Sequence, residues 1–133
     1  MAALDTNVLV RWVTGDDAAQ CAIIERLFRS AYARGERLSV PVTVLLEMEW
    51  VLRSRYRFDR TSITAVLDAL LSAFELEIME EAAVEHATWL FKRDGAPDFA
   101  DCLHVGLAAK AGSDPLLTFD ARASRLEGAR LPA

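Results

Sequence analysis

Short apolar runs alternate along this chain with longer segments in which apolar residues recur every three or four positions. The short runs predict strands, and the longer segments predict amphipathic helices. The first 13 residues indicate a short strand that ends at Asp5 and continues at once into a helix. Further helices are expected over residues 17–34, 42–56, 61–74, 80–93 and 97–112, and strands over 38–40, 75–79, 116–118 and 129–131, with a short helical piece after residue 120.

The alternation of short strands with longer helices predicts an α/β fold in which helices cover a parallel sheet. The chain has 133 residues, of which 53% are hydrophobic, and this is enough for one sizeable core. No repeat, linker or low-complexity segment divides it. We therefore expect a single domain over residues 1–133.

The net charge of −5 argues against a protein that binds nucleic acid through a broad basic surface. It does not exclude a nuclease whose acidic site is neutralised by metal ions. Cys21 and Cys102 lack metal-type spacing, so a reduced, cytoplasmic setting is expected. The chain starts without a basic leader, and no apolar run approaches the roughly 20 residues that span a bilayer. We expect no membrane association.

Asp5 is the first acid in a position suited to chemistry. It follows a short apolar run, and ligands of open parallel sheets bind at the carboxyl ends of the strands. The alternative is that Asp5 or Asn7 caps the following helix, because both residue types are favoured N-caps. The residues around Asp5 alone favour the cap.

Glu47 lies inside an almost wholly apolar helical segment. A carboxylate on or beside a buried face is costly unless it is paired, protonated or bound to a cation. The alternative is that Glu47 or Glu49 simply occupies the solvent side of the helix. Their spacing puts the two on different faces, so at most one is expected to be functional, and Glu47 is nearer the strand end.

Asp98 and Asp101 are three residues apart at a predicted helix start, where they share a face. The alternative is that Asp98 is the N-cap and Asp101 a first-turn acid, both favoured by the helix dipole. His104 extends the same face, but a lone histidine more often packs through hydrogen bonds than binds a metal. We do not count it as catalytic.

Asp120 is the last of the candidate acids, and like Asp5 it comes just after a predicted apolar strand. A turn or a helix cap is the alternative, with Thr118 an ordinary strand residue. If these acids meet at one rim of a sheet, they repel one another strongly without cations. An oxygen-rich site of this kind suits Mg²⁺ or Mn²⁺, which hold a phosphate and activate water.

A cluster of arginines supplies the densest positive charge in the chain and is a candidate surface for binding phosphate groups. The alternative is a solvated helix end, where basic residues also complement the dipole. The cluster consists of Arg53, Arg55, Arg57 and Arg60.

With these residues in place, the chain resembles the PIN domain, and more closely the VapC-like toxins of bacterial toxin–antitoxin pairs. The resemblance covers nearly the whole chain, and its segments are specific in combination and order. In chain order they are Leu4-Asp5-Thr6-Asn7-Val8-Leu9, Leu46-Glu47 with Trp50-Val51-Leu52, Asp98-Phe99-Ala100-Asp101 with Leu103-His104, and Thr118-Phe119-Asp120.

The resemblance implies a three-layer α/β/α fold with a central, largely parallel sheet, and a metal-dependent endoribonuclease activity that uses Mg²⁺ or Mn²⁺. It also implies a homodimer and a small antitoxin partner whose carboxyl-terminal segment covers the site. It places the acidic site at Asp5, Glu47, Asp101 and Asp120, with Asp98 as an additional acid and with Thr6, Asn7 and Thr118 orienting carboxylates or waters.

Two other function classes fit parts of the chain. A phosphohydrolase with an aspartate nucleophile also places Asp after its first strand, but that chemistry usually has a second acid two residues later, where this chain has Asn7. A catalytically weak protein-interaction module would keep the fold and bind a partner. The intact set of acids argues against the module.

Overall fold

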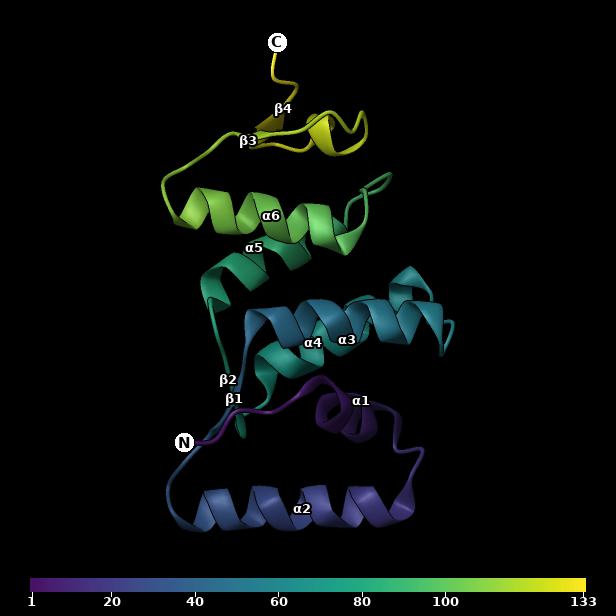
Figure 1. Ribbon diagram of the computed structural model, residues 1–133, viewed down its shortest axis with the longest axis vertical. Helices are drawn as coiled ribbons and strands as arrows, with labels where there is room; N and C mark the ends of the chain where they lie inside the picture. The colour runs from purple at the N-terminus through teal and green to yellow at the C-terminus, as the bar shows by residue number, and fades with distance from the viewer. The chain divides into compact units, whose positions relative to one another are not determined.

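The computed structural model describes residues 1–133, and the contacts within the chain divide them into two compact units. Unit 1 is Met1–Met79 and unit 2 is Glu80–Ala133 (Figure 1). The expectation of a single domain over residues 1–133 stays a prediction. No helix in the chain has both the length and the apolar composition needed to cross a membrane.

Unit 1 holds a parallel pair of strands and the helices around it. In this pair, β1 and β2 lie with Leu38 opposite Leu76 and Val40 opposite Ile78. The predicted opening strand is reduced to one parallel bridge between Ala3 and Ser39. The elements in order are α1 (Thr6–Thr14), α2 (Ala18–Ala33), β1 (Leu38–Val40), α3 (Val42–Ser54), α4 (Arg60–Ser72) and β2 (Leu76–Ile78).

Helices α1, α2 and α4 of unit 1 begin where acidic side chains satisfy free backbone N–H groups, whereas α3 begins after Pro41 without a side-chain cap. Asp17 accepts a hydrogen bond from the N–H of Gln20 at 3.0 Å, and Asp59 accepts one from Ser62 at 2.8 Å. Helix α1 packs against α2 and α3, while α4 packs against α3 and β2. Apolar residues at helical spacing on α3 and α4 are fully buried, namely Leu45, Met48, Leu52, Ile63, Leu67 and Leu70.

Unit 2 is built on the packing of α5 (Glu81–Phe91) against α6 (Phe99–Lys110), which Figure 1 shows crossing closely. Gly106 on α6 makes this approach possible, because a Cβ there would overlap the carbonyl oxygen of Ala83 on α5. The helices are followed by β3 (Leu116–Leu117), a 3₁₀ helix η1 (Ala123–Arg125) and β4 (Ala129–Arg130).

The strands of unit 2 are also parallel, with Leu116 of β3 opposite Ala129 of β4. The sequence predicted a buried strand at residues 116–118, and this detail is wrong: Leu117 is 54% exposed and Leu116 is half-buried. The reason is that β3 is only two residues long and pairs with a strand that is equally short. The predicted edge strand near residue 129 and the helical piece after residue 120 are confirmed.

Candidate acidic site

Asp5 is positioned by the start of α1. Its backbone is extended, and its side chain accepts a hydrogen bond from the N–H of Thr6 at 2.7 Å. Asp5 is therefore the N-cap that the sequence allowed as an alternative. The capping bond occupies one carboxylate oxygen, and the residue is exposed, so a cap and a cation ligand are compatible at this position.

Thr6 joins Asp5 to a second acid from a distant part of the chain. Its side chain is 8% exposed, and its hydroxyl donates a hydrogen bond to Oε1 of Glu47 on α3. A hydroxyl held in a buried position fixes the carboxylate that it contacts. The structure thus brings together Asp5, Thr6 and Glu47 in unit 1, with Asn7 exposed beside them.

The sequence placed Glu47 on or beside a buried face of its helix, and this detail is wrong. Glu47 is exposed, whereas Glu49 is the buried carboxylate of α3, with 1% of its surface accessible. The Nε of Arg53 lies 2.9 Å from Oε2 of Glu49, and this ion pair compensates the buried charge. The burial cost expected for Glu47 therefore belongs to Glu49, and Arg53 has a structural role of its own.

The unit 1 acids line a pocket of about 350 Å³ between α1 and α3, here called the α1–α3 pocket. Its other side carries basic and aromatic residues that the sequence reasoning did not connect with Asp5. The signal was available as helical spacing, because Arg11 lies four residues after Asn7 and Trp50 three residues after Glu47. The lining residues are Asp5, Thr6, Asn7, Val10, Arg11, Glu47, Trp50, Val51, Arg55 and Tyr56.

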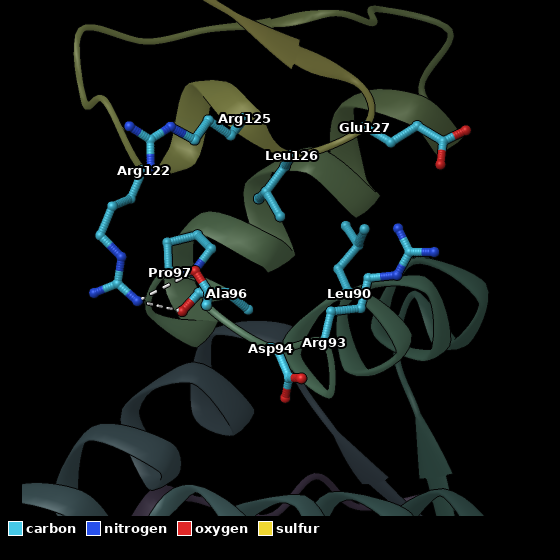
Figure 2. Close-up of a pocket in the computed structure, with 10 residues that line it drawn as sticks. Leu90, Arg93, Asp94, Ala96, Pro97, Arg122, Arg125, Leu126 and Glu127 are labelled. Carbon is cyan, nitrogen blue, oxygen red and sulfur yellow. Dashed lines mark hydrogen bonds between the residues drawn. The ribbon is translucent and has the colours of Figure 1, made fainter.

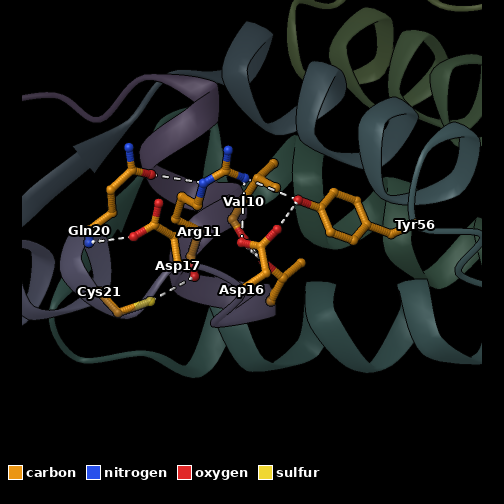
Figure 3. Close-up of polar contacts among 8 residues, drawn as sticks. Val10, Arg11, Asp16, Asp17, Gln20, Cys21 and Tyr56 are labelled. Atoms are coloured by element: carbon orange, nitrogen blue, oxygen red, sulfur yellow. Dashed lines mark hydrogen bonds and ion pairs between the residues drawn. The ribbon is translucent and has the colours of Figure 1, made fainter.

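Arg11 is held in place at the edge of this pocket (Figure 3). Its Nε donates to Gln20 at 2.8 Å, and its Nη1 donates to the hydroxyl of Tyr56 at 3.0 Å and lies 3.4 Å from Asp16. Hydrogen bonds from the hydroxyls of Tyr56 and Thr14 lower the pKa of the Asp16 carboxyl. Asp16 is thus kept ionised as the counter-ion of Arg11.

Unit 2 carries the remaining acids around the start of α6. Asp98 is in the N-cap position, but its side chain makes no capping hydrogen bond, so the cap reading does not account for its carboxylate. Asp101 is half-buried in the first turn. Burial raises its pKa, the negative charges of Asp120 and Asp98 raise it further, and His104 acts in the opposite direction. The structure therefore gathers Asp98, Asp101 and Asp120 in one electrostatic environment.

Asp120 is held by the turn that follows β3. Its N–H donates to the hydroxyl of Thr118 at 3.0 Å, and its Oδ1 accepts from the N–H of Ala123 at 2.8 Å. The turn that the sequence analysis gave as the alternative for Asp120 is thus present. Thr118 helps to position Asp120, because its hydroxyl accepts the hydrogen bond from the backbone N–H of Asp120.

Arg122 connects this turn to the loop that leads into α6. Figure 2 shows its side chain reaching back to the carbonyl oxygen of Ala96, to which Nη2 donates at 2.7 Å. The same nitrogen donates to the carbonyl of Gly95 at 3.3 Å. Because Ala96 is two residues before Asp98, this contact secures the segment before Asp98 to the segment after Asp120.

The donor chemistry fits a hard divalent cation, because every candidate ligand is a carboxylate oxygen. The pKa of Asp101, which burial and the charges of Asp120 and Asp98 raise, fits as well, since a bound cation would relieve the repulsion between these charges. The structure shows no group of three or more His, Cys, Asp or Glu side chains placed to hold a metal ion. Asp5 and Glu47 belong to unit 1, and Asp98, Asp101 and Asp120 belong to unit 2.

Parallel strands alternating with helices define an α/β protein, and its candidate aspartates lie where helices or turns begin. The chain belongs to the PIN domain family, whose profile matches residues 2–129. The chain is 30% identical over 127 residues to a VapC ribonuclease of Aquifex aeolicus, covering 95% of this chain and 92% of that protein. A solved structure, the sarcin-ricin loop cleaving toxin VapC20 of Mycobacterium tuberculosis, aligns over 98% of both chains with 19% identity and a TM-score of 0.42.

These comparisons confirm the family resemblance and the α/β class that the sequence indicated. They do not test the individual site residues. The assignment of Asp5, Glu47, Asp98, Asp101 and Asp120 as ligands stays a prediction.

The contact between Thr6 and Glu47 gives a first testable expectation. Replacing Thr6 by Val keeps the side-chain shape and removes the hydroxyl, so we expect a loss of about 1 kcal/mol in the free energy of unfolding. Residues that orient metal ligands typically contribute about 10–100-fold to activity. If Glu47 is a metal ligand, Thr6→Val should lower metal-dependent activity by this factor, measured as kcat/KM.

The matched control is Thr88→Val. Thr88 is buried to a similar extent, with 3% exposed, but its hydroxyl donates to the backbone carbonyl of Val84 rather than to a carboxylate. This change should lower stability without lowering activity beyond the loss of folded protein. Equal losses of activity in both variants would show that the hydroxyl of Thr6 acts only in folding.

Proposed function

We propose that the protein is an endoribonuclease that hydrolyses RNA phosphodiester bonds with Mg²⁺ or Mn²⁺, and that it is the toxin of a toxin–antitoxin pair. The observation that carries this proposal is the similarity to a VapC ribonuclease over 95% of the chain. The carboxylates at the starts of α1 and α6 and after β3 support it, because metal-dependent phosphodiester hydrolysis needs oxygen ligands of this kind.

In this proposal Asp5, Glu47, Asp101 and Asp120 hold the cation, and Asp98 is an additional ligand. A divalent cation bound there supplies a Lewis acid for the phosphate and lowers the pKa of a bound water. The hydroxyl of Thr6 orients Glu47, and Thr118 fixes the backbone of Asp120.

In the same proposal, the raised pKa of Asp101 makes metal binding depend on pH. A carboxyl that retains its proton is a poor cation ligand, so the metal must displace that proton on binding. We expect metal affinity, and with it activity, to rise with pH across the raised pKa of Asp101.

The test is cleavage of single-stranded RNA by the purified protein with millimolar Mg²⁺ or Mn²⁺, with chelator as control and p-nitrophenyl phosphate as a substrate for phosphatases. We expect RNA cleavage that chelator abolishes, and sequencing of the RNA ends then gives the cleavage position. The absence of RNA cleavage with either metal would contradict the proposal. Turnover of the phosphate monoester instead would favour an aspartate-type phosphohydrolase.

The proposal includes a homodimer in the cytoplasm and a smaller antitoxin partner. Light scattering should give twice the chain mass of 14.7 kDa at micromolar concentration. Coexpression with a small protein encoded beside the gene should yield a stable complex without RNA cleavage. A monomer under these conditions, with no such neighbouring protein, would contradict this part of the proposal.

A further inference from the structure

The α1–α3 pocket contains groups that coordination of a cation does not use. Besides Asp5 and Glu47, it is lined by the indole of Trp50 and the guanidinium of Arg55. The Trp50 side chain is 52% exposed and lies in no aromatic pair of the structure. Arg55 is exposed, and its side chain makes no hydrogen bond or ion pair within unit 1.

An aromatic ring and a free cation beside acids are suited to one kind of ligand. Unpaired bases stack on exposed aromatic side chains, and guanidinium groups form bidentate hydrogen bonds with phosphate oxygens. The pocket volume of about 350 Å³ is at the small end of the range for small-molecule sites, which suits a single nucleotide. Duplex RNA keeps its bases stacked inside the helix and cannot present one to Trp50.

Arg11, the second arginine of the pocket, has a structural role. Arg11 is already bound to Gln20, Tyr56 and Asp16 (Figure 3), so its charge is fixed and largely balanced. The same hydrogen bonds fix the side chain of Tyr56. Because Tyr56 directly follows Arg55, they also restrain the carboxyl-terminal end of α3, where Arg55 lies. Arg55 is the cation that remains for a ligand.

We propose that the α1–α3 pocket binds one unpaired nucleotide of the RNA, with the base stacked on Trp50 and its phosphate paired with Arg55. This inference rests on the proposed ribonuclease function and deepens it, because it names the residues that bind one nucleotide of the RNA. Asp5 and Glu47 line the same pocket, so the nucleotide is bound beside two of the acids assigned to the cation.

The experiment measures the affinity of a fluorescein-labelled RNA tetranucleotide in the presence of chelator, so that no cleavage takes place. Removing one base stack should weaken binding by about tenfold in Trp50→Ala, and Trp50→Phe should restore most of it. Arg55→Gln should weaken binding and make the dependence of log Kd on log salt shallower by about 0.7, the contribution of one phosphate contact on a single strand. A longer RNA that is fully base-paired should bind more weakly than a single strand of the same length.

Two variants outside the pocket serve as matched controls. Trp89 on α5 is 49% exposed, almost as much as Trp50, and its ring lies 4.1 Å from the guanidinium carbon of Arg93. Arg26 is an exposed arginine on α2. Trp89→Ala and Arg26→Gln should leave the RNA affinity and its salt dependence unchanged, and melting curves of all variants confirm that they are folded.

The outcomes separate this inference from the proposed function. If the wild type cleaves RNA but Trp50→Ala and Arg55→Gln bind it as tightly as the wild type, the inference is wrong and the function stands. If the wild type does not cleave RNA with metal, the function fails, while tight binding that depends on both side chains would still support the nucleotide site. Unchanged RNA affinity with weakened binding of a partner protein would identify the pocket as a protein interface and overturn the inference.

Discussion

Asp5→Asn should abolish most of the metal-dependent RNA cleavage while leaving the fold intact. Asn is as good an N-cap as Asp, so the hydrogen bond to the N–H of Thr6 can be kept. The change removes the negative charge that a cation needs. We expect kcat/KM to fall by about 100-fold or more, since changing a mere supporting residue of a metal site already costs up to about this much. The free energy of unfolding should change by less than about 1 kcal/mol.

The chain offers a matched control for this substitution. Asp17 is the N-cap of α2 and accepts a hydrogen bond from the N–H of Gln20 at 3.0 Å, but it does not line the α1–α3 pocket. Asp17→Asn should keep full activity. Metal-dependent activity that survives in Asp5→Asn would show that Asp5 is a cap only. An equal loss in both variants would assign the effect to capping.

Asp101→Asn should separate metal binding from stability in the metal-free protein. Because burial and the charges of Asp120 and Asp98 disfavour the ionised form of Asp101, the neutral amide should make the protein as stable as the wild type or more stable in chelator. Metal at about 100 times its Kd should stabilise the wild type by about 2.7 kcal/mol, and the variant should lose most of this gain together with RNA cleavage. Melting curves in chelator and in millimolar metal measure both effects.

If Asp101 served only the helix dipole, the same substitution would have the opposite sign. Asn would then cost about 0.3–1 kcal/mol in chelator, and the response to metal would be unchanged. Asp59→Asn is the control for this behaviour, because a hydrogen bond from the N–H of Ser62 lowers the pKa of Asp59 and favours its ionised form. It should lower the melting temperature and leave the metal response intact.

The pH dependence of these variants follows from the directions of the two pKa shifts. The pKa of Asp101 is higher in the folded protein than its ordinary value of 3.8, so its ionisation costs stability as the pH rises. The advantage of Asp101→Asn in chelator should therefore be absent below the ordinary value of 3.8 and should grow as the pH rises toward the raised pKa of Asp101. Asp59 behaves oppositely: its contribution is present above its ordinary pKa and lost as the pH falls through its lowered one. A pH-independent gap for Asp101→Asn would exclude the charge of Asp101 as its cause.

The local structure of this protein follows from local features of the sequence. The apolar periods predicted the helices and strands to within a few residues, because each amphipathic segment buries one face wherever it packs. Residue types that favour caps also indicated the start of α1, where Asp5 is the N-cap. The positions of Asp5 and Asp120 just after apolar runs were also visible, since they depend only on order along the chain.

The burial of individual acids was decided by the tertiary structure. The sequence puts Glu47 and Glu49 on different faces of a helix, but only the packing of α3 against its neighbours decides that Glu49 is the buried one, with Arg53 as its partner. The contact between Thr6 and Glu47 joins residues 41 positions apart, and no local rule predicts which hydroxyl meets which carboxylate.

The electrostatics of the candidate site likewise depend on folding. Burial raises the pKa of Asp101, and Asp120 on the turn after β3 raises it further. A sequence does not encode either effect in any short segment. The same holds for Arg11, whose ties to Tyr56 and Asp16 leave Arg55 as the available cation of the α1–α3 pocket. The sequence by itself determined which residue types and elements this protein has. Only the tertiary structure decided which charges are paired and which remain for a ligand, because Coulomb interactions and desolvation depend on distances that folding alone sets.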